Sequence, residues 1–267
     1  MIVPSDANSG VTYTQALSRG GALLEETRIL LLAWQPGEPF AALTERVLRG
    51  DLLGRATARR VSDIVRVFTT RFLMPSDAPA RHLRYLVVKD APRQIFSDLV
   101  FYYTALQDDL LRDFTVLHYW PAVREGRITF TPQDVRHLIL EAEQDGRIRS
   151  PWSSAIKRDM AARVLNTLTD FGLFHLIKIS VCEVAPYRPA DGTIVYMSYL
   201  LHANGITDSS LAEHSAWALF GLQAEDVWNR LEVLASDGWF IIQRAGQVVR
   251  ITWKFQSMED AVHAIAR

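Results

Sequence analysis

The stretch Trp152–Phe174, with the sequence WSSAIKRDMAARVLNTLTDFGLF, has the pattern of an amphipathic helix with a basic first turn, followed by a glycine and the start of a strand. Apolar residues spaced three and four apart share one helix face, and a glycine just beyond them favours the end of the helix. Four residues near this end have the spacing L-x-x-L-x-x-x-G-x-F: Leu165, Leu168, Gly172 and Phe174. The same spacing recurs at Leu231, Leu234, Gly238 and Phe240. The repeat predicts two winged-helix-like units.

The residues around the first copy predict the other elements of such a unit. Thr131-Pro132 opens a helix, with Thr131 at the cap and Pro132 at the first position, and this helix ends near Gly146. After the copy, Leu173–Ile179 and Val181–Val184 are expected to pair as a hairpin. Two helices followed by a hairpin are the expected order of a winged-helix unit.

The second copy lies between a similar set of patterns. One helix is predicted from Thr193 to Asn204-Gly205, and a second one, capped by Thr207 or Asp208, through Leu219. The patterns after the copy predict a hairpin of Phe240–Gln243 with Val248–Trp253 and a closing helix at Met258–Ile265.

The residues before Gly126 carry mainly helical patterns, of which the most apolar begins at Pro92. The predicted fold class is therefore mainly α. An N-terminal helical bundle at 1–126 is followed by two winged-helix-like units with short β-hairpins, at 127–190 and 191–267.

Composition limits the partners that can be expected. The formal net charge is −1 over 267 residues, so binding to nucleic acid must depend on local basic patches. Cys182 is the only cysteine, which excludes an internal disulfide and favours a reducing compartment. No apolar run approaches the roughly 20 residues that cross a bilayer. The sequence predicts a cytoplasmic protein that does not interact with a membrane.

Basic residues gather near the start of the Trp152–Phe174 helix and near the cap at Thr57. Around the first of these, Asp159 is expected to be the only nearby carboxylate. An ordinary exposed arginine face is the competing interpretation. The residues predicted to contact DNA are Arg55, Arg59, Arg60, Arg147, Arg149, Ser153, Lys157, Arg158, Arg163, Asn166 and Arg244.

The two copies differ at the start of the helix that would meet DNA. The second copy has Glu225 and Asp226 there, and carboxylates at that position favour the helix but repel phosphate. We therefore expect the first unit to bind DNA, with Arg244 on the second hairpin as a minor contact.

Motifs for catalysis are missing. The sequence contains no G-x-x-x-x-G-K-[ST], no G-x-G-x-x-G and no G-x-S-x-G. Asp108-Asp109 has the position of a solvated helix face rather than of a catalytic pair. We expect no catalytic residues, no metal, no cofactor and no small-molecule substrate, and hence not an enzyme.

Three segments together resemble the BrxA family: Ser18–Arg28, Thr57–Phe72 with its arginines, and Trp152–Leu173. BrxA proteins are accessory components of BREX bacteriophage-defence systems. The resemblance implies a mostly helical, cytoplasmic protein with helix-turn-helix modules. It also implies that the chain binds DNA and acts beside other BREX proteins in phage resistance.

Two functions remain open. The preferred one is a non-enzymatic accessory protein that binds double-stranded DNA, mainly through phosphates. The alternative is a protein–protein adaptor within the BREX complex that does not bind DNA, which the near-zero net charge favours. A metal-dependent nuclease is disfavoured because no lysine has an acidic residue two positions before it.

Overall fold

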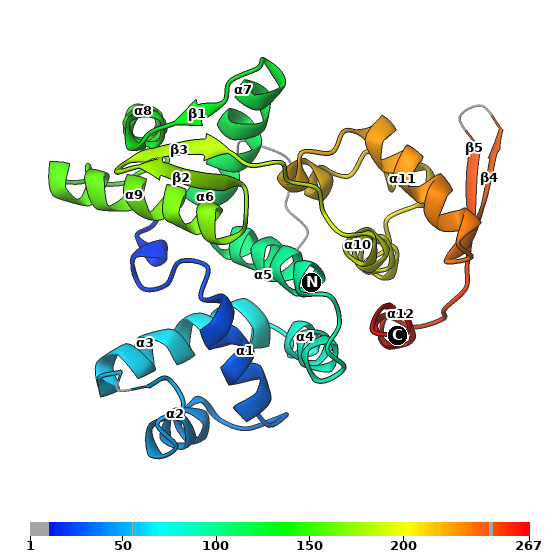
Figure 1. The fold of residues 1–267 in the computed structure, drawn as a ribbon, viewed down its shortest axis with the longest axis horizontal. Helices are drawn as coiled ribbons and strands as arrows, with labels where there is room; N and C mark the ends of the chain where they lie inside the picture. The colour runs from blue at the N-terminus through cyan, green and yellow to red at the C-terminus, as the bar shows by residue number, and fades with distance from the viewer. Residues whose placement is uncertain (1–10, 55, 246–247) are drawn as a thin grey trace. The chain divides into compact units, whose positions relative to one another are not determined.

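The structure is a computed structural model that describes residues 11–54, 56–245 and 248–267. Helices dominate these residues, and the strands form one three-stranded and one two-stranded antiparallel sheet (Figure 1). The prediction of a mainly α fold with short β-hairpins is confirmed. Within the described ranges, no helix is both long and apolar enough to span a membrane.

The chain forms two compact units, each assembled from segments that are distant in the sequence. What we call the larger unit contains residues 11–77 and Val100–Tyr187, and the smaller unit contains Ala78–Leu99 and Arg188–Arg267. The three consecutive domains expected from the sequence, 1–126, 127–190 and 191–267, stay a prediction.

The first part of the larger unit is helical, as the sequence patterns predict. A 3₁₀ turn at Ala16–Ser18 precedes three helices, α1 (Leu24–Ala33), α2 (Phe40–Arg49) and α3 (Ala58–Phe68). Thr57 caps α3, because its Oγ1 accepts a hydrogen bond from the Arg60 N–H at 3.2 Å. A π-helical turn, Thr69–Leu73, continues α3 and buries Phe72 against Tyr103.

Arg71 lies in this π-helical turn, and only 6% of its surface is exposed. Its Nη1 donates to the Gly21 carbonyl at 2.9 Å, and its Nη2 donates to the Gly20 carbonyl at 2.8 Å. Burial lowers the pKa of Arg71 to about 10, and the negative charge of Asp108 opposes this shift. The guanidinium therefore fixes the glycine pair before α1 to the end of α3.

The second part of the larger unit begins with the Val100–Gln107 portion of α5 (Arg93–Gln107), since the division between the units falls within this helix. It continues through short helices and strands, in the order α6 (Asp109–Asp113), a π-helical turn at Phe114–Tyr119, α7 (Trp120–Arg124), β1 (Thr129–Phe130), α8 (Pro132–Gln144), α9 (Ser154–Asp170), β2 (Phe174–Lys178) and β3 (Val181–Val184). The predicted helix at the opening stretch is thus α9, and the predicted hairpin is β2–β3.

The strand β1 joins the hairpin and completes a sheet of order β1-β3-β2. Phe130 pairs with Cys182, and Phe174 pairs with Val184. Behind the sheet, Tyr119 packs against Phe130 and Phe174, and its hydroxyl donates to the Leu173 carbonyl at 2.9 Å. These three aromatic side chains are buried and form the core beside the sheet.

The smaller unit contains two 3₁₀ turns and the first residues of α5, Arg93–Leu99, together with four α-helices and two strands. They are α4 (Ala78–Val88), α10 (Asp191–Ala203), α11 (Ala224–Ser236), β4 (Phe240–Ala245), β5 (Val248–Trp253) and α12 (Met258–Ile265). The helix α12 packs against α4 and α10. Buried Asp98 of α5 accepts hydrogen bonds from the Ala190 N–H at 2.9 Å and the Thr193 hydroxyl at 2.7 Å. This carboxylate caps α10 from a different helix, where negative charge is favourable.

The helix predicted from Thr207 or Asp208 through Leu219 is wrong. This segment forms two 3₁₀ turns instead, Asp208–Ser210 and Ser215–Phe220. The Asp208 carboxylate accepts from the Ile251 N–H of β5 at 2.7 Å, and the Trp217 indole N–H donates to the Leu211 carbonyl at 2.7 Å. These side chains bond to the hairpin and to the turn itself, so tertiary contacts override the helical spacing.

Replacing Arg71 by leucine tests the role of this buried cation. Arg71→Leu leaves two carbonyls without their donor and removes the positive charge near Asp108, and we expect it to lower the free energy of unfolding by about 3 kcal/mol. Urea unfolding measures the change. As a control, Arg66→Leu removes an exposed arginine from α3 and should change stability by less than about 0.5 kcal/mol. Equal effects of the two substitutions would contradict the structural role of Arg71.

Candidate nucleic-acid interface

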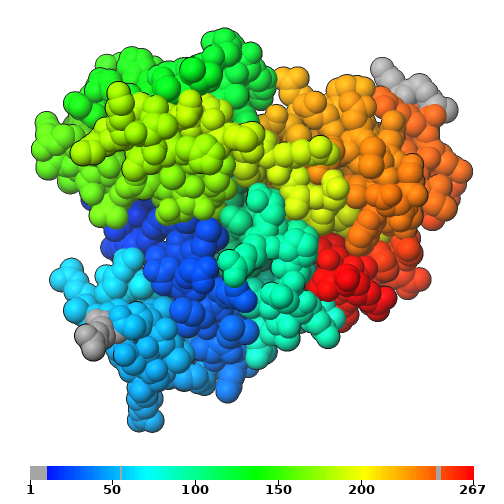
Figure 2. All heavy atoms as spheres, in the orientation of Figure 1, coloured from blue at the N-terminus to red at the C-terminus, as the bar shows by residue number. Residues whose placement is uncertain are grey.

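The N-terminus of α9 carries the basic cluster predicted from the sequence, and the segment around α9 lies on the face shown in Figure 2. Ser153 caps the helix, because its Oγ accepts from the Ile156 N–H at 3.3 Å. Arg149 and Arg158 are exposed, and neither guanidinium has a hydrogen bond or ion pair within the part of the chain that the structure describes. These two cations are available to a partner.

Lys157, the neighbour of Arg158, is already paired. Its Nζ donates to Glu143 Oε2 at 2.5 Å, and the other oxygen of Glu143 accepts from the Trp152 N–H at 2.8 Å. The hydrogen bond from Lys157 lowers the pKa of the Glu143 carboxyl. The expectation that Asp159 is the only carboxylate near this cluster is therefore wrong. The short connection between α8 and α9 brings Glu143, at the end of α8, against the start of α9.

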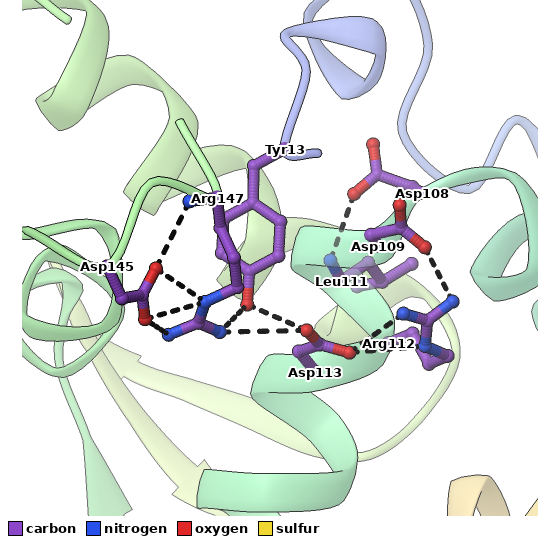
Figure 3. Close-up of polar contacts among 8 residues, drawn as sticks. All are labelled: Tyr13, Asp108, Asp109, Leu111, Arg112, Asp113, Asp145 and Arg147. Carbon is purple, nitrogen blue, oxygen red and sulfur yellow. Dashed lines mark hydrogen bonds and ion pairs between the residues drawn. The ribbon is translucent and has the colours of Figure 1, made fainter. Parts of the chain in front are cut away.

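Arg147 is compensated as well, and Figure 3 shows its surroundings. Its guanidinium bonds to Asp145, with Nη2 at 2.7 Å from Oδ2, and this bond raises the pKa of Arg147. Its Nη1 donates to the Tyr13 hydroxyl, which itself donates to Asp113 Oδ2 at 2.8 Å. Burial, followed by the charge of Asp113, raises the pKa of Tyr13. We call these four residues the Tyr13 clasp.

The Tyr13 clasp also has a backbone component. The Tyr13 N–H donates to the Arg147 carbonyl at 2.8 Å. The Arg147 guanidinium lies over the Tyr13 ring, with its Cζ 5.0 Å from the ring centroid. On the far side, Asp113 binds Arg112, which also pairs with Asp109 (Figure 3). Arg147 therefore fastens the segment before α1 to the α8–α9 connection.

The other predicted contact residues are distributed over both units. Arg163 pairs with Asp159 one helical turn away at 2.7 Å, and Asn166 is exposed on the same helix. Arg59 is exposed at the start of α3, whereas the Arg60 guanidinium donates to the Arg19 carbonyl at 2.6 Å. Arg244 stacks over Trp228 in the smaller unit, with Glu232 at 3.8 Å. Arg55 lies outside the described residues.

One exposed cation near α9 was missed by the sequence reasoning. Lys178 lies at the end of β2 in the hairpin, between exposed Ile177 and Ile179. The sequence could have indicated Lys178 as a contact, because it lies in the predicted hairpin, and the hairpin of such a unit lies close to the same partner as the helix.

In the smaller unit, Glu225 and Asp226 occupy the first turn of α11, and Asp226 accepts from the Gln223 N–H at 2.9 Å.

Asp108 is buried, so its assignment to a solvated face is wrong. One carboxylate oxygen accepts from the Leu111 N–H at 2.9 Å and caps α6, as Figure 3 shows. Burial raises the pKa of Asp108 to about 6, against the opposing effects of the Leu111 hydrogen bond and the charge of Arg71. Its neighbour Asp109 is the partly exposed member of the pair.

Comparison with known proteins identifies the family of the chain. The family model described as BrxA matches residues 11–185, which includes the whole α8–α9–β2–β3 region. The chain belongs to the BrxA family. BrxA proteins are accessory components of BREX systems and are not a known enzyme family, so membership gives this chain a BREX-associated role.

A solved structure with a similar fold is the crystal structure of an uncharacterized protein from Magnetospirillum magneticum. It shares 18% sequence identity with this BrxA-family chain at a TM-score of 0.60, and the match covers 79% of this chain and 98% of that one. The likeness extends the fold to a distant sequence. No curated protein matches the chain.

The raised pKa of Asp108 makes a prediction for stability against pH. A carboxyl whose pKa rises from 3.8 to about 6 on folding stabilises the fold while it is protonated, and that contribution of up to about 3 kcal/mol is lost as pH rises from 4 to 7. Asp108→Asn retains a capping side chain and cannot ionise. The free energy of unfolding of the natural protein, minus that of this variant, should therefore fall between pH 4 and pH 7. A pH-independent difference in urea unfolding would contradict the assignment.

Proposed function

We propose that this BrxA-family chain is a non-enzymatic accessory protein of BREX phage defence that binds double-stranded DNA through α9 and the β2–β3 hairpin. The observation that carries the proposal is a set of exposed cations without a described partner, Arg149 and Arg158 at the start of α9 and Lys178 on the hairpin. They extend over adjoining elements of one small module, as the two DNA-contacting parts of a winged helix do.

The topology of this module supports the same proposal. The chain runs through α7, β1, α8, α9, β2 and β3, and β1 completes the sheet beside β3. This is the element order of winged-helix modules, in which the second helix of the helix-turn-helix pair enters the major groove. In that arrangement α9 is the recognition helix, and its exposed Arg158 and Asn166 face DNA.

The contacts proposed from the sequence now fall into three groups. Arg149, Ser153, Arg158, Arg163 and Asn166 have exposed or half-exposed positions on or before α9, and we assign the phosphate contacts to the cations among them. Lys157 and Arg147 instead hold the module together through Glu143 and the Tyr13 clasp. Arg59 and Arg60 on α3, and Arg244 on β4, remain candidates for secondary contacts.

An adaptor role is the second candidate function, and a different observation favours it. The β2–β3 hairpin exposes Leu176, Ile177 and Ile179, the last of these at 94%. Apolar side chains that cluster on an exposed hairpin are typical of a surface that contacts another protein. In this alternative the hairpin binds another BREX protein without any contact to DNA.

Titration of the protein with random-sequence duplex DNA at several salt concentrations tests the proposal. We expect the affinity to fall steeply with salt, and Arg149→Gln/Arg158→Gln to weaken binding by roughly 2 kcal/mol and to reduce the salt slope by about 2. Arg93→Gln/Arg124→Gln removes the same charge from two exposed arginines elsewhere and should leave the affinity nearly unchanged.

Lys157 is left out of this variant because its loss would also break the ion pair with Glu143. Weakening by Arg59→Gln/Arg60→Gln instead would move the site to α3. No binding at low salt would refute DNA binding and favour the adaptor.

A further inference from the structure

The larger unit contains a cavity of about 200 Å³. It lies between the 3₁₀ turn at Ala16–Ser18, the end of α3 and the end of α5, and α9 takes no part in its lining. The polar side chains that matter for its chemistry are Arg19, Arg66, Arg71, Thr104 and Asp108.

Two buried oxygen atoms of the lining have no hydrogen-bond partner among the described residues, Thr104 Oγ1 and Asp108 Oδ2. The other Asp108 oxygen is bonded to the Leu111 N–H, and the Leu17 N–H lies near the carboxyl but outside hydrogen-bonding geometry. Buried polar groups in folded proteins are almost always hydrogen-bonded. Two unpartnered acceptors at one cavity therefore point to a ligand that supplies a hydrogen-bond donor.

Three guanidinium groups surround the same cavity. Arg71 is buried, whereas Arg19 and Arg66 are exposed and their guanidinium groups have no described ion pair or hydrogen bond. Against these three positive charges the lining offers one carboxylate, that of Asp108. The excess of positive charge favours an anion on the exposed side, and a guanidinium binds the oxygens of a phosphate group in a bidentate manner.

We propose that this cavity binds a small phosphate monoester that also carries a hydroxyl or amino group. The phosphate lies against Arg19 and Arg66. The hydroxyl or amino group donates to the Asp108 carboxylate, and the Thr104 hydroxyl donates to or accepts from the same group. A volume of about 200 Å³ is below that of most sites for drug-sized ligands, so the occupant is a small metabolite. This site departs from the sequence-based expectation of no small-molecule substrate, and it is independent of the proposed DNA-binding surface.

A phosphate group bound at this cavity belongs either to a free monoester or to the DNA backbone. The backbone phosphodiester carries one negative charge and no neighbouring donor for Asp108. A monoester close to neutral pH carries nearly two charges, and a hydroxyl or amino group on its carbon chain supplies the donor. The combination of three guanidinium groups with two unpartnered acceptors favours the free monoester.

Isothermal titration calorimetry of the full chain with four probes tests the proposal. Glycerol 3-phosphate and ribose 5-phosphate carry both groups, methyl phosphate lacks the donor and glycerol lacks the anion. We expect at least one of the first two to bind at least tenfold more tightly than methyl phosphate, and glycerol not to bind. Absence of binding by both hydroxylated phosphates, or equal binding by methyl phosphate, overturns the proposal.

Two variants separate the two halves of the site. Asp108→Asn retains the cap of α6 and should reduce the affinity for the hydroxylated phosphate at least tenfold, with little effect on methyl phosphate. Arg66→Gln changes an exposed side chain, so folding is preserved, and it should weaken both ligands several-fold. Arg124→Gln is the matched control and should change neither. Unchanged binding by Arg66→Gln refutes the site even where Asp108→Asn fails to fold.

Competition with duplex DNA distinguishes the two sources of phosphate. We expect saturating duplex to leave the affinity for the hydroxylated phosphate unchanged, and Arg149→Gln/Arg158→Gln to bind that ligand normally. Displacement of the ligand by duplex, together with weaker DNA binding by Asp108→Asn, would assign the cavity to a backbone phosphate and overturn the small-molecule proposal. The calorimetric titrations with the four probes contain no DNA, so failure of the ligand to bind and failure of DNA binding are separate results.

Discussion

A guanidinium buried among backbone carbonyls organises the larger unit. Arg71 binds the carbonyls of Gly20 and Gly21 and lies near the charge of Asp108. An isolated cation at this depth would be strongly unfavourable, so these acceptors are needed for the chain to fold. The glycines suit this loop because a Cβ at Gly21 would lie 2.9 Å from Thr167 Oγ1 of α9. One side chain thus couples α3, the loop before α1 and the wall of the cavity.

The sequence predicted local structure well where the signal was local. Thr57 caps α3 as expected, and the glycine-terminated repeat located both α9 and α11 with their hairpins. The prediction of local structure failed where contacts to a distant segment determine the conformation, as at Asp208, whose carboxylate accepts a hydrogen bond from β5. The assembly of each compact unit from separated segments is of the same kind, because contacts between distant segments leave no periodic pattern.

The candidate site shows the same limit. The basic cluster at the start of α9 could be predicted from residue types alone. The ion pair between Lys157 and Glu143 could not, because it depends on the packing of α8 against α9. A count of basic residues along a sequence therefore overstates the positive charge that a partner meets, because some of these residues form ion pairs within the fold. Here the pairing leaves Arg149 and Arg158 of the predicted cluster, and the structure adds Lys178 on the hairpin.

The Tyr13 clasp and the Lys157–Glu143 pair both restrain the connection that leads from α8 into α9. The residues between α8 and α9 are therefore restrained before any partner arrives. Ordering a loop on association lowers affinity, because conformational freedom is lost at that moment. In this chain the folding reaction has already ordered that connection. A ligand of α9 would meet a preorganised surface, and its contacts would contribute to affinity with little entropic loss from the protein.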